Sequence, residues 1–464
     1  MAVSATAPHI VTRSGSLRDG VLWSLVAAYA IVYFLLGWIR YACHGNFVDL
    51  GIFAQTASSA FGCFCNPIEG SHWAYHFSPI LYLAGALMAV WHSALALTAL
   101  QAAAGALTVP PIYGIVRRYA DRKAALMAAL VVLLYPPLGG VIFNDFHESG
   151  LAPAAVAWLL WAFDGGFVLA TVVFALLALA IKEDQALFLI VGGIAGAIVY
   201  RGDRIRFRLA AGIAVTAAII FVFFFALIQP HANVSAQWAP LRFFVGVHGF
   251  IFVAQVGYML LAFVPLLFIP FRTWAILLAI PPFIEVLSSS MPTTYTMGSH
   301  YAGAWIGYTF FAFAIGIVAI ARNNLHRAHR LLYWCIALCI VEFAVADPLH
   351  PGYFLHAPAA RDVRLDTFLG SLPPSIDVAT QEEAYTHLAA TDPHATLVPE
   401  FSPDALHSCY LLFDQEYPQS VRLIEFHSYA AQVKGYRAVR RDGGITLYRS
   451  ERCRQSNPPA HQRR

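Results

Sequence analysis

Residues 21–39, VLWSLVAAYAIVYFLLGWI, form an uninterrupted apolar run, and the stretch Asn46–Gln55, NFVDLGIFAQ, follows closely after it. A run of this length matches the roughly 20 residues that a helix needs to cross the hydrocarbon core of a bilayer. The second stretch places one carboxylate, that of Asp49, among aromatic and aliphatic residues just beyond this first span. Two interpretations of Asp49 stay open: a solvated loop acid or helix cap, and a functional acid at a membrane face.

The composition predicts that this run is one of many spans. Of 464 residues, 59% are hydrophobic and only 12% are charged, whereas soluble proteins carry about 25% charged residues. Further apolar runs bounded by arginine clusters indicate an all-α polytopic membrane protein of about 11 transmembrane helices. The candidate spans after the first are 94–116, 124–140, 150–163, 167–181, 186–200, 209–229, 250–270, 274–290, 302–321 and 331–347.

The arginine and lysine clusters predict the orientation of the chain. They lie near residues 13–18, 117–123, 201–208, 272 and 322–330, and the positive-inside rule places all of them in the cytoplasm. This requires that residues 78–91 form a re-entrant or interfacial helix that does not cross the membrane. We therefore expect a cytoplasmic segment 1–20, a membrane domain 21–347 with a first external loop 40–77, and an exported domain from residue 348.

The exported tail changes in composition. Residues 348–454 predict a small α/β domain with short strands near 376–380, 396–399 and 409–414 and helices at 381–390 and 421–433. The turn Asp442-Gly443-Gly444 indicates a hairpin, and residues 455–464 are expected to be disordered. Cysteines occur in the first loop and in the tail, where an oxidising compartment would permit disulfides, but their spacing leaves the pairing open.

With this orientation, acidic clusters gather on the exported face although the charge rule used no acids. Asp145, His147 and Glu148 offer oxygen and imidazole groups that suit a divalent cation (Mg²⁺ or Mn²⁺) or a proton-transfer pair. The alternative is a set of loop residues that cap two helices. Two further acids, Glu183 and Asp184, stand beside Lys182, either as functional groups or as a neutralised helix terminus.

Histidines and a tyrosine complete the candidate site. His76 lies in the first loop, and His300 precedes Tyr301 near the start of a later span. These side chains are candidates for contacts with an anionic headgroup or donor phosphate, or else packed polar residues and part of an interfacial aromatic belt. Glu285 and Glu342 are acids within predicted spans, a position in which ionisable residues are usually functional. Phosphate-loop, GxSxG and HExxH patterns are absent from the sequence, which disfavours nucleotide-driven transport and serine or zinc hydrolysis.

Several motifs together resemble the membrane-protein family called domain of unknown function 2079. They are RY, NFVDLGIFAQ, HFSPI, NDFHE and KEDQAL, followed by SHYAGAWI, VATQEEAYTHLA and YLLFD. That family is grouped with the GT-C glycosyltransferases, multispanning enzymes that transfer sugars from polyprenyl-phosphate donors on the exported face. The resemblance implies that Asp49 is the catalytic acid of the first external loop. Better-known members carry paired acids there, whereas Asp49 stands alone.

The resemblance favours a glycosyltransferase of the bacterial inner membrane that uses a lipid-linked sugar donor. In this hypothesis Asp49 is the base, and Asp145, His147, Glu148, Glu183 and Asp184 bind a metal or the acceptor. Phosphate would be met by His76, Lys182, His300 and Tyr301. Two other classes stay open: a transporter or flippase of a lipid-linked or small anionic substrate, and a non-enzymatic membrane scaffold whose tail binds a partner.

Overall fold

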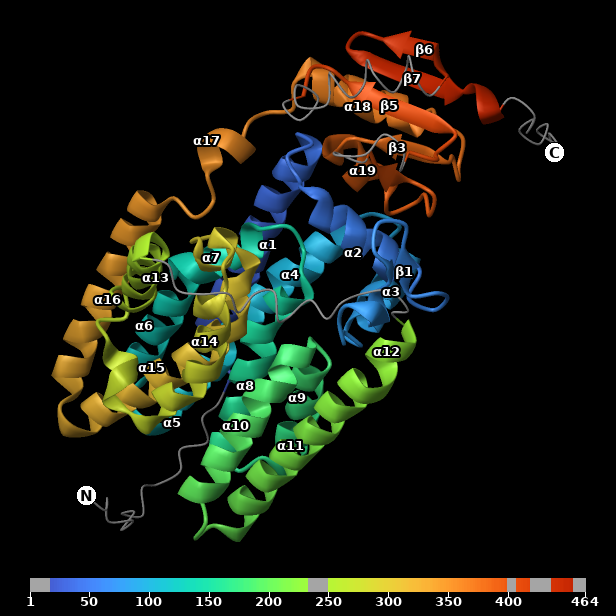
Figure 1. Cartoon of the computed structure of the whole chain (residues 1–464). Helices are drawn as coiled ribbons and strands as arrows, with labels where there is room; N and C mark the ends of the chain where they lie inside the picture. The colour runs from blue at the N-terminus through green and yellow to red at the C-terminus, as the bar shows by residue number, and fades with distance from the viewer. Residues whose placement is uncertain (1–16, 233–248, 399–405, 418–434, 454–464) are drawn as a thin grey trace.

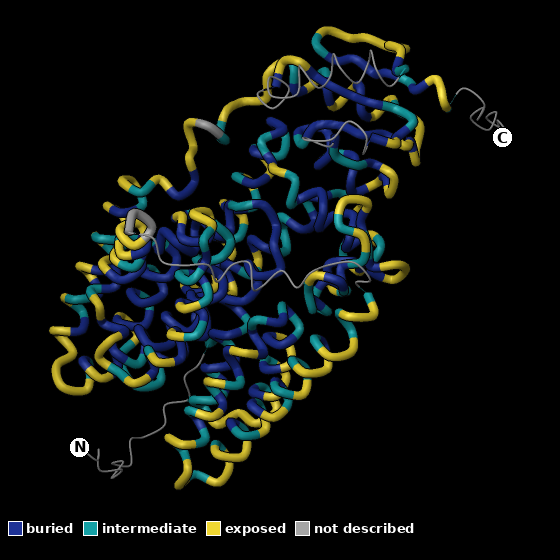
Figure 2. Tube along the Cα trace, in the orientation of Figure 1, coloured by how far each residue is buried: buried dark blue, intermediate teal, exposed yellow. Residues whose placement is uncertain are grey.

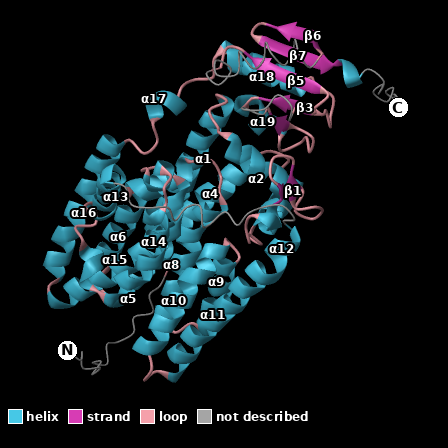
Figure 3. Cartoon of the chain, in the orientation of Figure 1, coloured by secondary structure: helices cyan, strands magenta, loops and turns pink. Residues whose placement is uncertain are grey.

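A computed structural model describes residues 17–232, 249–398, 406–417 and 435–453. Figure 1 shows a large body of helices with a smaller sheet-containing domain at one end, and Figure 3 shows that the five-stranded sheet belongs to that domain. The predicted helix 421–433, the tail 455–464 and most of segment 1–20 lie outside the described residues.

The α-helices follow one another along the chain, with short 3-10 segments between some of them. Their bounds are α1 Gly20–Ala42, α2 Val48–Ser58, α3 Leu81–Val90, α4 Leu95–Leu107, α5 Val109–Tyr119, α6 Arg122–Leu133, α7 Pro136–Phe143, α8 Ala152–Gly165, α9 Val168–Leu179, α10 Glu183–Val199, α11 Arg204–Phe223, α12 Gln229–Ala232, α13 Gly249–Phe263, α14 Ile280–Ser288, α15 Gly303–Asn323, α16 Leu325–Ala346, α17 Pro351–Phe354, α18 Ala360–Gly370 and α19 Glu382–Leu388.

Within the described residues, five continuous helical segments are long and apolar enough to cross a membrane. They are Gly20–Ala42, Leu95–Tyr119, Arg204–Ala232, His300–Asn323 and Leu325–Ala346. A sixth span is formed if α6 and α7 count as one helix bent by 49°. The bend falls at Pro136 and Pro137, because proline cannot continue the hydrogen-bond ladder of a helix. The other apolar helices are shorter, among them α3, whose 10 residues extend about 15 Å.

Burial separates a central helix from peripheral ones. In α15, 83% of its apolar window is buried, against 17% for the segment that contains α11. Figure 2 shows the same contrast, with buried trace inside and exposed trace along α11 and α16. The close packing of α15 depends on Gly303 and Gly307: a Cβ on Gly307 would lie 2.8 Å from the Cβ of Val156, and one on Gly303 would collide with the carbonyl of Ser149. These contacts hold α15 against segment 144–151 and α8.

The C-terminal domain contains a mixed sheet with the strand order β4-β3-β5-β7-β6. The strands are β3 Val378–Thr380, β4 Thr396–Leu397, β5 Tyr410–Asp414, β6 Tyr436–Asp442 and β7 Ile445–Ser450. Strand β3 is parallel to β4 and β5, whereas β7 is antiparallel to β5 and β6. The predicted hairpin is present, with Gly443 at φ 57° in its turn. Helix α18 was missed by the sequence analysis.

The C-terminal domain packs on α2 through α19. The hydroxyl of Tyr385 donates to Oε1 of Gln55 over 2.7 Å, and both side chains are buried. The Tyr385 ring lies directly over Gly51, where a Cβ would collide with it. The small residue at position 51 therefore lets the C-terminal domain pack on the helix that begins beside Asp49.

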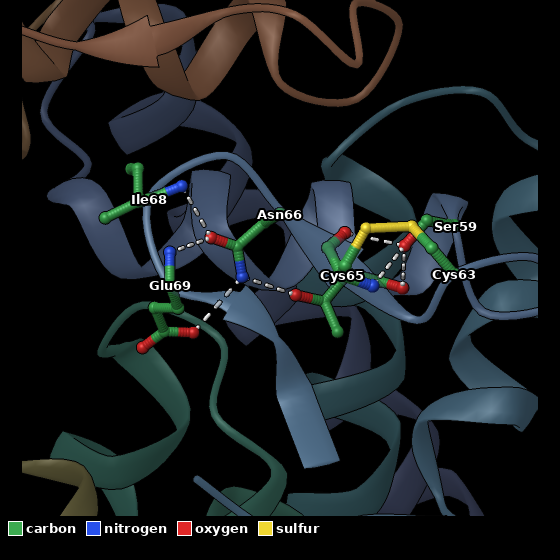
Figure 4. The surroundings of a disulfide bond; sticks show 7 residues. Ser59, Cys63, Cys65, Asn66, Ile68 and Glu69 are labelled. Carbon is green, nitrogen blue, oxygen red and sulfur yellow. Dashed lines mark hydrogen bonds between the residues drawn. A yellow bond between two sulfur atoms is a disulfide. The ribbon is translucent and has the colours of Figure 1, made fainter. Parts of the chain in front are cut away.

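Two disulfides join cysteines whose pairing the sequence left open. Cys409 is bonded to Cys453 in the C-terminal domain, and Cys63 is bonded to Cys65 in the first loop. Figure 4 shows how Asn66 shapes this loop beside the second disulfide: its Oδ1 accepts hydrogen bonds from the backbone N–H groups of Ile68 and Glu69. Glu69 is thereby held at the rim of the region described next.

Candidate active site at the ends of the helices

Four segments that are distant in sequence bring their polar residues together. They are the first turn of α2, the stretch 144–151 between α7 and α8, the residues that lead into α10, and the 3-10 turn His300–Ala302 before α15. The structure places all of the predicted site residues in these segments or, for His76, in the first loop. The predicted clusters therefore form one connected region.

Asp49 and His147 form the contact at its accessible edge. Oδ2 of Asp49 lies 3.4 Å from Nε2 of His147, and the carboxylate side chain is 42% exposed while that of His147 is 11% exposed. One face of the His147 ring stacks on the ring of His300, with the ring centroids 3.4 Å apart, and His300 in turn contacts the ring of Tyr301. Asp49 is thus the most exposed end of a row of buried and half-buried side chains.

This contact shifts the pKa values of both partners. Burial by itself raises the pKa of Asp49, but the His147 imidazole beside it and the more distant Arg40 lower that pKa below its usual value. Burial lowers the pKa of His147, and the Asp49 carboxylate outweighs it, so that the pKa of His147 is raised. At neutral pH the pair is therefore a carboxylate next to an imidazole that binds protons more readily than usual.

The Asp145 carboxylate is buried and bonds to other groups of the chain. Its Oδ1 lies 2.8 Å from the Arg40 guanidinium and accepts a hydrogen bond from Asn46 over 2.9 Å. Its Oδ2 accepts from the backbone N–H of Leu50 at 3.4 Å. Asp145 and Arg40 are 1% and 2% exposed. The carboxylate therefore connects the end of α1 to the beginning of α2 and sets the position of Asp49.

Lys182 lies among acids at the buried end of the region. Its Nζ is 4.0 Å from a carboxylate oxygen of Glu148 and 4.0 Å from one of Asp184. Burial lowers the pKa of Lys182, but Asp184, Glu148 and further acids including Glu285 raise it above its usual value. Lys182 is therefore a charged ammonium, and Glu148 retains one buried oxygen, Oε2, without a hydrogen-bond partner among the described residues.

His76 and Glu183 tie the first loop to α10. Nδ1 of His76 lies 2.9 Å from Oε1 of Glu183, and the other carboxylate oxygen accepts the N–H of Phe77 over 2.9 Å. Burial opposes charge on His76, but Glu183 raises the pKa of this histidine. The pair lies beside Lys182, whose charge acts on both residues.

Gln101 holds the backbone of segment 144–151 in place and was not among the residues predicted from the sequence. Its Oε1 accepts the backbone N–H of His147 over 3.0 Å, and its Nε2 donates to the carbonyl of Asn144 over 2.9 Å. The signal was present: Gln101 is an amide inside an apolar span, where polar groups are costly unless they bond. Glu285 was noted as unexplained, and the structure brings its charge within range of Lys182. Glu342 lies on α16 and is buried.

Two of the acids predicted to bind Mg²⁺ or Mn²⁺, Asp145 and Glu183, are engaged by other groups of the chain. The oxygens of Asp145 are engaged by Arg40, Asn46 and Leu50, and those of Glu183 by His76 and Phe77. The Lys182 ammonium lies between the remaining acids, where a cation would otherwise stand. Among the described residues, two groups of three metal-ligating side chains do occur, but both lie where the C-terminal domain meets α1.

Comparison with solved structures shows which known fold this chain resembles. The fold is similar to the crystal structure of ArnT from Cupriavidus metallidurans bound to undecaprenyl phosphate, with a TM-score of 0.58, 14% identity, and coverage of 93% of this chain and 98% of that chain. The apo state of ArnT matches with a TM-score of 0.56 at the same identity and coverage. This is the fold of the GT-C glycosyltransferases, on a multispanning membrane protein.

A more distant likeness involves the oligosaccharyltransferase of Archaeoglobus fulgidus in complex with Zn and sulfate, with a TM-score of 0.44, 14% identity, and coverage of 86% of this chain and 68% of that chain. Curated protein sequences gave no match. The profile of the family described as "Predicted membrane protein (DUF2079)" matches residues 21–358. The chain belongs to this family, which confirms the assignment made from its motifs, and the fold class expected from the sequence is confirmed as well.

Proposed function

We propose that this protein transfers a sugar from a polyprenyl-phosphate donor to an acceptor on the exported face of the bacterial inner membrane. The observation that carries the proposal is that one polar region holds both an accessible, ionised carboxylate, Asp49, and a charged ammonium among buried acids, Lys182. The GT-C fold supports the same class of reaction.

The reaction needs a base and a positive centre. The acceptor hydroxyl attacks the anomeric carbon of the sugar, its O–H bond breaks and the proton passes to Asp49. The bond from the anomeric carbon to the phosphate oxygen breaks, and its electron pair leaves with the polyprenyl phosphate. Asp49 suits the first role because it is exposed enough to meet a hydroxyl and is held by His147. Lys182, with His76 nearby, suits the second because its charge offsets the negative charge of the departing phosphate.

His300 and Tyr301 extend the row of rings beside His147 and offer a surface for the sugar or the phosphate. Asp145 enters the proposal as a positioning residue, because its oxygens hold Arg40 and the first turn of α2. Glu148, one oxygen of which has no hydrogen-bond partner in the part of the chain that the structure describes, is the acid we assign to a hydroxyl of the acceptor or the sugar.

An apolar groove supports a lipid donor. A cavity of about 480 Å³ between α13 and α14 is lined by aromatic and aliphatic side chains, including Phe252, Phe263, Phe283 and Leu287. Helix α14 also carries Glu285, whose charge acts on Lys182. An isoprenoid chain in this groove would thus have its phosphate end near the polar region, with the tail kept in an apolar environment.

The disulfides support the proposed orientation. Cys63 and Cys65 lie in the first loop, and Cys409 and Cys453 lie in the C-terminal domain. Disulfides persist in exported, oxidising compartments and are rare in the cytosol. Both regions are those that the arginine and lysine clusters assign to the exported face.

The test is a transfer assay with purified protein and a panel of undecaprenyl-phosphate sugars, in which released undecaprenyl phosphate is measured. Asp49→Asn should reduce release by about 100- to 10,000-fold, the usual contribution of a general base. The matched control is Asp347→Asn, because Asp347 is an exposed acid at φ 44°, a conformation that asparagine tolerates. Equal release by Asp49→Asn and wild type would refute the role of Asp49. Movement of intact donor across liposomes without release would instead indicate a flippase.

A further inference from the structure

A second polar cluster lies where the C-terminal domain meets the end of α1, outside the proposed active site. It consists of His44 just after α1, Asp366 on α18 and His387 on α19. Oδ1 of Asp366 is 3.2 Å from Nε2 of His44 and 3.1 Å from Nδ1 of His387. The three ligand atoms lie within 4.8 Å of one another.

Hydrogen bonds determine which ring nitrogens carry protons. Nδ1 of His44 lies 2.9 Å from the carbonyl oxygen of Glu383, and Nε2 of His387 lies 3.1 Å from that of Tyr41. A carbonyl oxygen only accepts, so the nitrogen that faces it is the one that bears hydrogen. In a neutral imidazole the other nitrogen then presents a lone pair. Both lone pairs face the Asp366 carboxylate, which also only accepts.

Three electron-rich atoms that face one another need a positive charge between them. Protons supply it incompletely, because the two rings stack with centroids 3.8 Å apart and two adjacent imidazolium ions repel. In addition, Nε2 of His44 is buried and has no hydrogen-bond partner of acceptable geometry among the described residues.

We propose that His44, Asp366 and His387 bind a divalent transition metal ion of the Zn²⁺ class. Two imidazole nitrogens and one carboxylate oxygen are a common ligand set for such ions. With bonds of about 2.0–2.1 Å, neighbouring ligand atoms of a tetrahedral zinc site lie about 3.3 Å apart, close to the 3.2 and 3.1 Å separations present. The Asp366 side chain is 49% exposed, which leaves a position for water.

The surroundings match those of metal ligands. Histidines that bind metals donate their second N–H to a carbonyl or carboxylate, as both rings do here. The lone pair of each imidazole nitrogen lies in the plane of its ring and must point at the ion, so the stacked rings of His44 and His387 must separate when the ion binds. A ring that rotates about its N–H···O hydrogen bond keeps that bond. The bound ion would fasten the C-terminal domain to the end of α1.

The neighbouring group Cys43, His356 and Asp362 needs no ion. The Cys43 thiol donates to the carbonyl of His356 over 3.0 Å. The Asp362 oxygens accept from the N–H of Ala359 at 2.6 Å and from the Tyr417 hydroxyl at 2.7 Å. Its members are satisfied by the protein, whereas the His44 group is not. Cys43→Ser therefore tests whether zinc binds at the group of Cys43, His356 and Asp362 instead of at the group of His44.

The test uses full-length protein without a polyhistidine tag, stripped with chelator and titrated with ZnSO₄ in a competition assay. Wild type, Cys43→Ser and His394→Gln, a variant at an exposed histidine of the same domain, should each bind one zinc ion. Asp366→Asn and His387→Gln should bind it more than about 100-fold more weakly, because even the loss of a group that only hydrogen-bonds to a metal ligand costs 10- to 100-fold.

Cobalt provides a readout that misfolding cannot imitate. Co²⁺ bound to wild type should give the intense visible absorption of four-coordinate cobalt, and Asp366→Glu, which keeps a carboxylate, should retain it while Asp366→Asn does not. No zinc binding by wild type at micromolar concentration would overturn the proposal. So would equal affinity in wild type and Asp366→Asn, or loss of binding in Cys43→Ser alone.

Discussion

The buried ion pair between Arg40 and Asp145 gives the most exact stability prediction. Asp145→Asn keeps the shape of the side chain but removes its charge, so that Arg40, 2% exposed, stays buried without its counter-ion. Breaking a buried pair in this way costs about 3–5 kcal/mol. The lower end applies here, because Arg40 also donates to the carbonyls of Gly45 and Phe143 and lies over the ring of Phe354.

A loss of about 3 kcal/mol lowers the folding equilibrium constant by roughly a hundredfold. The assay is reversible unfolding in mixed micelles with increasing dodecyl sulfate, followed by tryptophan fluorescence. Asp49→Asn is the comparison: its carboxylate is 42% exposed, so screening limits its loss to about 1 kcal/mol. The two variants should therefore separate clearly in stability although both lose transfer activity.

A double mutant isolates the pair. Arg40→Met with Asp145→Asn should cost about 2 kcal/mol less than the sum of the single changes, since neither charge is then left alone. If Asp145→Asn costs less than 1 kcal/mol, or if the double mutant is additive, the assignment of Asp145 as the residue that positions α2 is wrong.

Three other predictions concern His147, Gly51 and the C-terminal disulfide. The pKa of His147 is raised in the folded state, so its pairing with Asp49 stabilises the protein fully below pH 6.5. This stabilisation is lost as the pH rises through the raised pKa. The difference in unfolding free energy between wild type and His147→Gln should therefore become smaller at alkaline pH. Gly51→Ala should increase hydrogen exchange in α19, because its Cβ collides with the Tyr385 ring, whereas Gly352→Ala, where a Cβ meets open space, should not. Cys409→Ser with Cys453→Ser should destabilise the C-terminal domain by up to about 4 kcal/mol, the loop-closure value for a separation of 44 residues, without changing zinc binding.

Much of the architecture followed from local patterns. Apolar runs marked the helices of the membrane body, and the alternation and turn residues of the tail marked its strands, since both depend on neighbours along the chain. Helix α18 was missed although Leu365, Phe368 and Leu369 stand at the i, i+3 and i+4 spacing of one helix face, because most of its other residues are polar.

The sequence allowed us to select the residues of the candidate site, but not the contacts between them. The residue types Asp49, His147 and Lys182 could be selected from their positions at the ends of apolar runs. The engagement of Asp145 by Arg40 could not, because it joins residues 105 positions apart through tertiary packing. His44 gave no local signal either, since its partners Asp366 and His387 come from the C-terminal domain.

The most direct measurement is thiol labelling at position 49 with a membrane-impermeant reagent in intact spheroplasts. Asp49→Cys and Asp203→Cys form a matched pair, because the two native side chains are 42% and 38% exposed. We predict that Asp49→Cys is labelled from outside and is protected by undecaprenyl phosphate, whereas Asp203→Cys is labelled only after permeabilisation. Labelling of Asp49→Cys only after permeabilisation, or labelling unaffected by undecaprenyl phosphate, would contradict an exported donor site built around Asp49.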